Sequence, residues 1–139
     1  MHFLRMEILK SFVYFALIMN NSSHLDLGKR GEQIAVSYLV EKEYDIVETR
    51  WKHKHKEIDI IAKKNRTLVV VEVKTRSDNK YTQPEDAVDI KKQRFLTEAI
   101  EAFIQNYVDF DEIRFDIIAI LLKQNEYTIY HIENAFEPV

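Results

Sequence analysis

The feature that most constrains the fold is a pair of β-branched runs, residues 57–62 and 67–74, separated by a polar tetrapeptide at 63–66. Two such runs around a short segment with a turn-forming Asn predict a β-hairpin. Residues 68–71 are apolar without a break, so both faces of the second strand are apolar. A strand of this kind belongs in the middle of a sheet covered on both sides, which favours an α/β protein.

The rest of the chain supplies the helices that such a sheet requires. Apolar residues recur every three or four positions in two segments, and they alternate or cluster with β-branched residues in three others. The predicted order of helix, three strands, helix and two strands describes an α/β fold with a mixed sheet of about five strands flanked by helices. The helices are expected at residues 28–43 and 89–107, the second opened by Pro84-Glu85-Asp86, and the further strands at 44–51, 113–122 and 127–133.

The chain of 139 residues has the size of one domain, which we expect to span residues 28–139. It has no cysteine, which excludes disulfides and thiolate zinc sites and fits a reducing cytoplasm, the expected location. In the N-terminal extension, residues 1–27, the apolar stretch Ile8–Met19 contains Lys10 and is shorter than the ~20 residues needed to span a bilayer. Because it also lacks a small-residue cleavage pattern, we expect an accessory helix, or an upstream extension if Met19 is the natural start.

The charges are unevenly distributed along the chain. The net charge of -3 excludes a simple polycation that coats nucleic acid. Residues 50–94 nevertheless hold 13 Lys/Arg against 7 Asp/Glu, whereas residues 95–139 hold 2 against 9. A local basic surface is therefore expected, with ordinary solvated charges as the alternative.

Charged residues interrupt the hairpin where burial is expected. Asp59 interrupts an isoleucine run, and Glu72 and Lys74 punctuate the valine run of the second strand. Carboxylate oxygens bind Mg²⁺ at roughly 2.0 to 2.1 Å, and a lysine beside the ion can orient or deprotonate an attacking water or stabilise developing negative charge. The pattern indicates a divalent-metal site for phosphodiester chemistry; ordinary acid–lysine ion pairs on a partly exposed strand are the alternative.

This interpretation depends on the strand register. If Lys63 faces Arg66 across the turn, Asp59 lies opposite Val70 and one diagonal step from Glu72. The two acids then share one face, with diagonal Cβ atoms roughly 7 to 8 Å apart. A register change of one residue would put Asp59 on the opposite face.

Four ordered motifs carry a resemblance to a known group of proteins. The sequence resembles the PD-(D/E)XK nuclease superfamily and, more closely, the uncharacterised bacterial YraN-like family, which is similar to archaeal Holliday junction resolvases. Ile58 stands where the motif's name has proline, which weakens only the bare motif. The residues that carry the resemblance are Glu32 after Gly31, Glu57-Ile58-Asp59-Ile60-Ile61-Ala62, Val71-Glu72-Val73-Lys74-Thr75-Arg76, and Lys91-Lys92-Gln93-Arg94 with Arg114-Phe115-Asp116.

The resemblance implies a restriction-endonuclease-like fold and a set of site residues. Asp59, Glu72 and the backbone carbonyl of Val73 would hold Mg²⁺ or Mn²⁺, and Lys74 would be catalytic. Glu32 would complete the site, and Gln93 would lie near it. The alternatives are a dipole-favoured acid near a helix N-terminus for Glu32 and a solvent-facing side chain for Gln93.

A basic loop beside the hairpin is the candidate contact for nucleic-acid phosphates. His53 and His55 lack a second ligand pair, which argues against a zinc site. Taken individually, each basic residue is better explained as an ordinary solvated charge. The candidate nucleic-acid-binding residues are Lys29, Arg30, Lys52, His53, Lys54, Thr75, Arg76, Lys92 and Arg94.

Three functional hypotheses remain. The first is a metal-dependent endonuclease that hydrolyses phosphodiester bonds in DNA, with branched DNA suggested by the resemblance. The second is a catalytically inactive nucleic-acid-binding or assembly module with a nuclease fold. The third is a homodimeric structural protein whose acidic C-terminal third binds another protein. Separately, Tyr127, Ile129 and His131 share one strand face, for which surface or dimer packing is expected, and the role of Asp116 is left open.

Overall fold

A computed structural model describes residues 27–77, 88–123 and 126–138. The apolar stretch at 8–19 and the helix opening at 84–86 lie outside the described residues. Within those described ranges, no helix is long and apolar enough to cross a membrane.

The predicted α/β fold is confirmed. Five strands form one sheet in the order β1-β2-β3-β4-β5, with β3 in the centre as expected. β3 and β4 are parallel and the other neighbours are antiparallel, so the sheet is mixed. The elements are α2 (Leu27–Glu41), β1 (Asp45–His53), β2 (Lys56–Lys64), β3 (Thr67–Arg76), α3 (Ile90–Phe103), the 3-10 helix η2 (Ile104–Asn106), β4 (Glu112–Lys123) and β5 (Glu126–Phe136).

The start of α3 differs from the prediction. Val88 and Asp89 are not helical, so this helix does not continue from an opening at 84–86. Asp89 has an extended backbone, and its carboxylate accepts the N–H of Lys92 at 2.8 Å. A carboxylate in this position satisfies one of the unpaired N–H groups of the first turn, which explains why the helix begins at Ile90.

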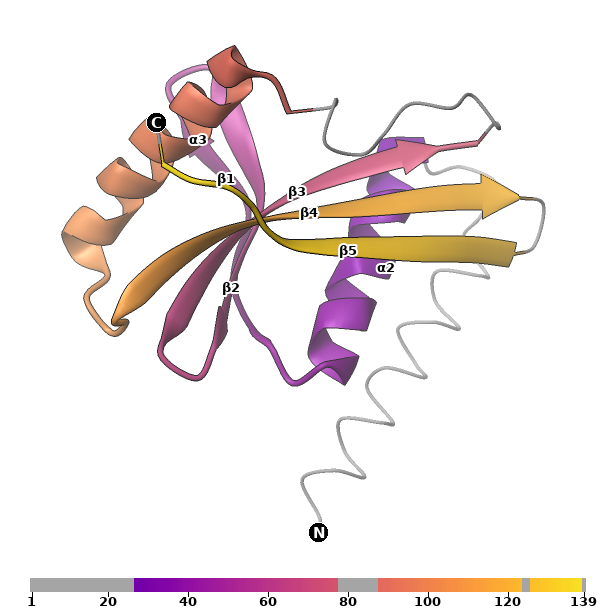
Figure 1. The fold of residues 1–139 in the computed structure, drawn as a ribbon, viewed down its shortest axis with the longest axis horizontal. Coiled ribbons are helices and arrows are strands. Elements are labelled where there is room, and N and C mark those ends of the chain that lie inside the picture. Colours follow the sequence, from indigo (N-terminus) through magenta and orange to yellow (C-terminus); the bar gives the residue numbers. More distant parts are fainter. Residues whose placement is uncertain (1–26, 78–87, 124–125, 139) are drawn as a thin grey trace, which may run out of the picture.

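The sheet separates two apolar cores, one under each long helix (Figure 1). Ile34, Ala35 and Leu39 of α2 pack with one set of strand residues. Phe95, Leu96, Ala99 and Ile100 of α3 pack with the alternate set. Covering both faces removes the apolar side chains of the central strand from water, which is the main stabilising term of such a fold.

A buried polar network ties β4 to β5. The Asp116 side chain is fully buried and accepts two hydrogen bonds from the Arg114 guanidinium, both at 2.8 Å. It also lies 2.7 Å from His131 Nε2 and accepts the N–H of Asn134 at 3.0 Å. Burial alone would raise the pKa of Asp116, but the hydrogen bonds from His131, Arg114 and Asn134 outweigh it and lower the pKa. Asp116 is therefore a structural residue.

The expectation of surface or dimer packing is wrong for His131. Its side chain is largely buried, and Nδ1 lies 3.1 Å from the Tyr38 hydroxyl of α2 while Nε2 faces Asp116. Tyr127, on the same strand, is exposed. His131 turns inward because a buried carboxylate needs a partner, which an alternation pattern alone does not reveal.

Replacing Asp116 should destabilise the fold strongly. Asp116→Asn removes the buried negative charge that pairs with the half-buried Arg114 guanidinium, which keeps the more distant Glu133 at 3.9 Å, so we expect a loss of about 3 kcal/mol in the free energy of unfolding. Urea denaturation measures this loss. Asp111→Asn is the matched control, because Asp111 pairs with Arg66 on the surface, where solvent screens the pair, and its loss should be much smaller. Equal losses in the two variants would contradict the structural role of Asp116.

Candidate functional site

The turn of the β2–β3 hairpin lies one residue later in the chain than predicted. The expected pairing of Lys63 with Arg66 is wrong, because Lys64 pairs with Thr67, so the two connecting residues are Asn65 and Arg66 instead of Lys64 and Asn65. Asn65, the first of them, has a φ of 55°. Asn tolerates this left-handed conformation better than most residues, which makes the short connection feasible.

The corrected register brings the two acids closer together. Partners shift by two positions, so the paired side chains from Ile60 to Lys64 keep their predicted faces. The last paired residues before the site are Ile60 and Val71. One further step along this register places Asp59 opposite Glu72 instead of Val70.

At Asp59, β2 changes which side of the strand packs against which apolar core. Ile58 and Ile60 are two positions apart and should share a face, yet Ile58 packs in the α3 core and Ile60 in the α2 core. In β1, the residue across from Asp59 is Arg50, which has a φ of 51°. The irregularity therefore affects both strands at the same position, although the β1–β2 register continues unbroken from the Thr49–Ile60 pair to the Trp51–Ile58 pair.

The carboxyl groups of Asp59 and Glu72 converge in a half-buried position. The Val73 N–H donates to Asp59 Oδ2 at 2.8 Å, which fixes the Asp59 side chain against β3. The two carboxyl groups are close enough to share a hydrogen bond when one of them is protonated. Burial, and then the charge of Glu72, raise the pKa of Asp59 to about 7. Burial also raises the pKa of Glu72, although Lys92 opposes this shift.

Gly31 allows α2 to approach this position closely. A Cβ atom on Gly31 would overlap the hydroxyl oxygen of Thr75 and lie within 2.9 Å of its two side-chain carbons. The glycine therefore permits close contact between α2 and the Thr75 side chain at the end of β3. The next residue, Glu32, lies near enough for its charge to raise the pKa of Asp59. Its Oε2 atom accepts a hydrogen bond from Arg50 Nε at 2.8 Å.

Lys74 and Gln93 occupy different surroundings. Lys74 is exposed on β3, and its charge acts to lower the pKa of Glu72, which places it beside the acid pair. The side-chain amide of Gln93 donates to the Val88 carbonyl at 3.1 Å at the start of α3. The structure therefore brings Glu32, Asp59, Glu72 and Lys74 together, whereas the described hydrogen bond of Gln93 is to the backbone before its own helix.

The candidate nucleic-acid-binding residues divide into four groups. Lys52, His53 and Lys54 lie at the end of β1 and each faces a carboxylate, Glu57 for the first and Glu98 of α3 for the other two. Lys92 turns inward, with Nζ 3.3 Å from Glu72 Oε1. The Thr75 side chain packs against Gly31. The remaining candidates are exposed or half-buried on α2, the end of β3 and α3: Lys29, Arg30, Arg76 and Arg94.

The acid pair fits a hard divalent cation. When both acids are ionised, Glu72 Oε2 is buried and meets no hydrogen-bond donor, a position that a bound cation would satisfy. Oxygen donors suit Mg²⁺ or Mn²⁺ better than softer metals. In the described part of the chain, no three His, Cys, Asp or Glu side chains form a complete metal cage. Such an open site leaves positions for waters and a phosphate, as Mg²⁺ sites in phosphoryl-transfer enzymes do.

Two contacts of this site were not predicted from the sequence. Arg50 pairs with Glu32, and Lys92 pairs with Glu72 instead of facing solvent. An arginine in a left-handed conformation has no sequence signature, because glycine and asparagine are the residues that normally mark it. The capping residue Asp89, three positions before Lys92, was the available signal for where α3 begins.

The raised pKa of Asp59 predicts a stability that depends on pH. Between pH 3.8, its ordinary pKa, and about pH 7, its raised pKa, the Asp59 carboxyl is protonated in the folded protein and ionised in the unfolded chain. The contribution of Asp59 to the free energy of unfolding is fully present below pH 3.8, and it is lost as the pH rises to about 7. Asp59→Asn should therefore raise the melting temperature by several degrees at pH 8 and by less at pH 5, as measured by thermal unfolding. Glu98→Gln should give no such gain, because Lys54 lowers the pKa of Glu98. The idea fails if the Asp59→Asn variant melts below the wild type at pH 8.

Comparison with known proteins assigns the chain to a family. The model of the family described as Uncharacterised protein family UPF0102 matches residues 31–120. The chain is 47% identical to the UPF0102 protein FP2501 of Flavobacterium psychrophilum over 116 residues, or 83% of this chain and 97% of that protein. UPF0102 proteins of Parabacteroides distasonis and Bacteroides thetaiotaomicron are 46% and 42% identical, over 80% and 84% of this chain and 92% and 97% of their own lengths. The chain therefore belongs to the UPF0102 (YraN-like) family, within the restriction-endonuclease-like superfamily.

Proposed function

We propose that this protein is a metal-dependent endonuclease that hydrolyses phosphodiester bonds in DNA. The observation that carries the proposal is the convergence of Asp59 and Glu72, two half-buried carboxyl groups from adjacent strands, beside Lys74. A fold gains no stability from placing two acids together, since each raises the free energy of the other's charged form. Perturbed carboxyl groups that face one another are characteristic of functional sites.

The residues suit the steps that hydrolysis of a phosphodiester requires. A divalent cation held by Asp59, Glu72 and the Val73 carbonyl would supply polarisation of the phosphate and activation of water when bound. Lys74 would orient or deprotonate the attacking water, or stabilise the negative charge that develops on the phosphate. Glu32 would complete the acid cluster from α2, and the Val73 N–H would keep the Asp59 carboxylate oriented. The bond broken is the one between phosphorus and the leaving sugar oxygen.

The basic residues around the site support a nucleic-acid substrate. Lys29, Arg76 and Arg94 lie on three elements, α2, β3 and α3, that also contribute residues to or beside the acid pair. Phosphate contacts of this kind position a nucleic acid without specifying its sequence. We propose DNA as the substrate, and the resemblance to junction resolvases makes branched DNA the first form to test.

Cleavage assays on linear, flapped and four-way DNA, with and without Mn²⁺, test this function. We expect metal-dependent cleavage of at least one substrate by the wild-type protein. Asp59→Ala should abolish it, because a carboxylate that holds the cation is lost. Lys74→Ala should slow turnover by about 10² to 10⁴, the usual contribution of a proton-transfer group, while Mn²⁺ affinity changes little.

Lys123→Ala is the matched control, since Lys123 is an exposed strand lysine at the end of β4. It should cleave at the wild-type rate. Unchanged cleavage by purified Asp59→Ala would refute the assignment of the site. Salt-sensitive binding of DNA without cleavage in any divalent ion would favour the alternative, a nuclease fold that acts as a binding or assembly module.

A further inference from the structure

Two basic side chains neutralise the acid cluster from elements that do not contribute its acids. Lys92 of α3 places Nζ 3.3 Å from Glu72 Oε1. Arg50 of β1 places Nε 2.8 Å from Glu32 Oε2. Both basic groups therefore form ion pairs with carboxylates that the proposed function assigns to the site.

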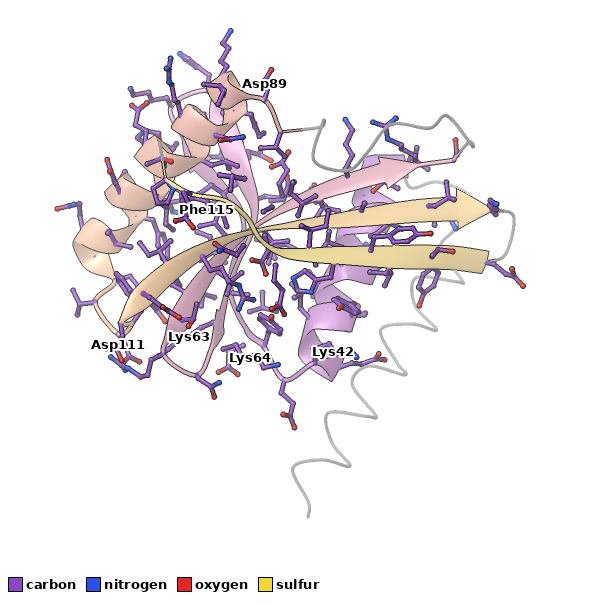
Figure 2. The ribbon with its side chains drawn as sticks, viewed as in Figure 1. Lys42, Lys63, Lys64, Asp89, Asp111 and Phe115 are labelled. Atoms are coloured by element: carbon purple, nitrogen blue, oxygen red, sulfur yellow. The ribbon has the colours of Figure 1, made fainter. Side chains whose placement is uncertain are left out.

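Lys92 is held in this inward position by its own helix. The Asp89 carboxylate accepts the Lys92 backbone N–H at 2.8 Å, which fixes where the first turn of α3 begins (Figure 2). The ammonium group lies 5.6 Å from the centre of the Phe95 ring. The Lys92 side chain is 30% exposed and the Glu72 side chain 13%, so their pairing is shielded from bulk water more than a surface ion pair would be.

Arg50 reaches Glu32 from a backbone conformation that arginine rarely adopts. Its φ of 51° lies in the left-handed region, in the middle of strand β1. Conformations of this kind cluster at functional sites, where the direction of a side chain matters more than the small loss of stability. In β1, Arg50 is also the residue across from Asp59.

The charges explain why such partners are present and what happens to them when a cation binds. Three acids, Glu32, Asp59 and Glu72, are matched by three bases, Arg50, Lys74 and Lys92. Adding a divalent cation to this balanced set leaves an excess of positive charge, and the cation competes directly with Lys92 for Glu72. The excess suits a phosphate group, which binds both ammonium and guanidinium groups.

Building on the proposed function, we infer that Arg50 and Lys92 are exchangeable counter-ions of this site. They neutralise Glu32 and Glu72 before a divalent cation binds. After it binds, they contact phosphate oxygens of the nucleic-acid backbone. The same two residues therefore weaken binding of the cation and strengthen binding of the nucleic acid.

Two binding measurements that require no cleavage test this exchange. Arg50→Gln and Lys92→Gln should each bind Mn²⁺ about five- to tenfold more tightly in calorimetric titrations at pH 8. Each substitution removes a positive charge whose repulsion of the cation is on the order of a few kT. In Ca²⁺, each should bind a DNA duplex about tenfold more weakly, with a salt dependence shallower by about one phosphate contact. A purely structural role would weaken both kinds of binding.

Lys63→Gln is the matched control. Lys63 pairs with Asp109 at 2.6 Å, at the end of the sheet away from Asp89 (Figure 2). This variant should leave both affinities unchanged. Wild-type affinities for Mn²⁺ and DNA in Arg50→Gln and Lys92→Gln would overturn the exchange while leaving the proposed function intact. Absence of Mn²⁺ binding by the wild-type protein would overturn both.

A glycine variant separates the Arg50 side chain from its backbone. Arg50→Gly suits the left-handed conformation, so the melting temperature should not fall, and Mn²⁺ affinity should still rise. Glu43→Gly is the control: Glu43 has a φ of 67° after α2 and should gain stability without a change in Mn²⁺ affinity. A correctly folded Arg50→Gly protein with weaker Mn²⁺ binding would overturn the role of Arg50.

Discussion

The burial of two carboxyl groups side by side is the constraint on which the site depends. Asp59 and Glu72 are removed from most of the solvent that would stabilise their charges, and each disfavours ionisation of the other. Such a pair persists only if protons, hydrogen-bond donors or cations offset the cost. The Val73 N–H and the Lys92 ammonium supply two of these contacts, and Asp59 retains a proton to nearly neutral pH.

The fold meets this constraint at the boundary between its two apolar cores. The central strand β3 carries Glu72 between a parallel and an antiparallel neighbour, and β2 changes faces at Asp59. Gly31 lets α2 come close enough to add Glu32 to the cluster. Each contributor is held by a regular element rather than by a loop, which keeps the arrangement of the acids defined.

Asp116 is a third acid removed from solvent, and its contrast with the Asp59–Glu72 pair is informative. Asp116 accepts hydrogen bonds from a guanidinium, a histidine ring and a backbone N–H, and its pKa is lowered. Asp59 has a raised pKa, and its neighbour Glu72 has one oxygen with no donor. A satisfied buried network stabilises a fold, whereas an incompletely satisfied one leaves room for a ligand. This difference separates the structural acid from the candidate functional pair.

The sequence by itself determined the element order, the central position of β3 and the shared side of Asp59 and Glu72. The repeat of apolar residues every 2 positions in a strand and every 3.6 in a helix is a local property of the sequence. The predicted β2–β3 register was wrong by two positions, an even number, which leaves the paired side chains on their predicted faces. The same local pattern misplaced His131, whose inward contacts depend on another strand. Only the tertiary structure decided that Arg50 and Lys92 face the acids. Those contacts join β1 to α2 and α3 to β3, and their geometry depends on how separate elements pack.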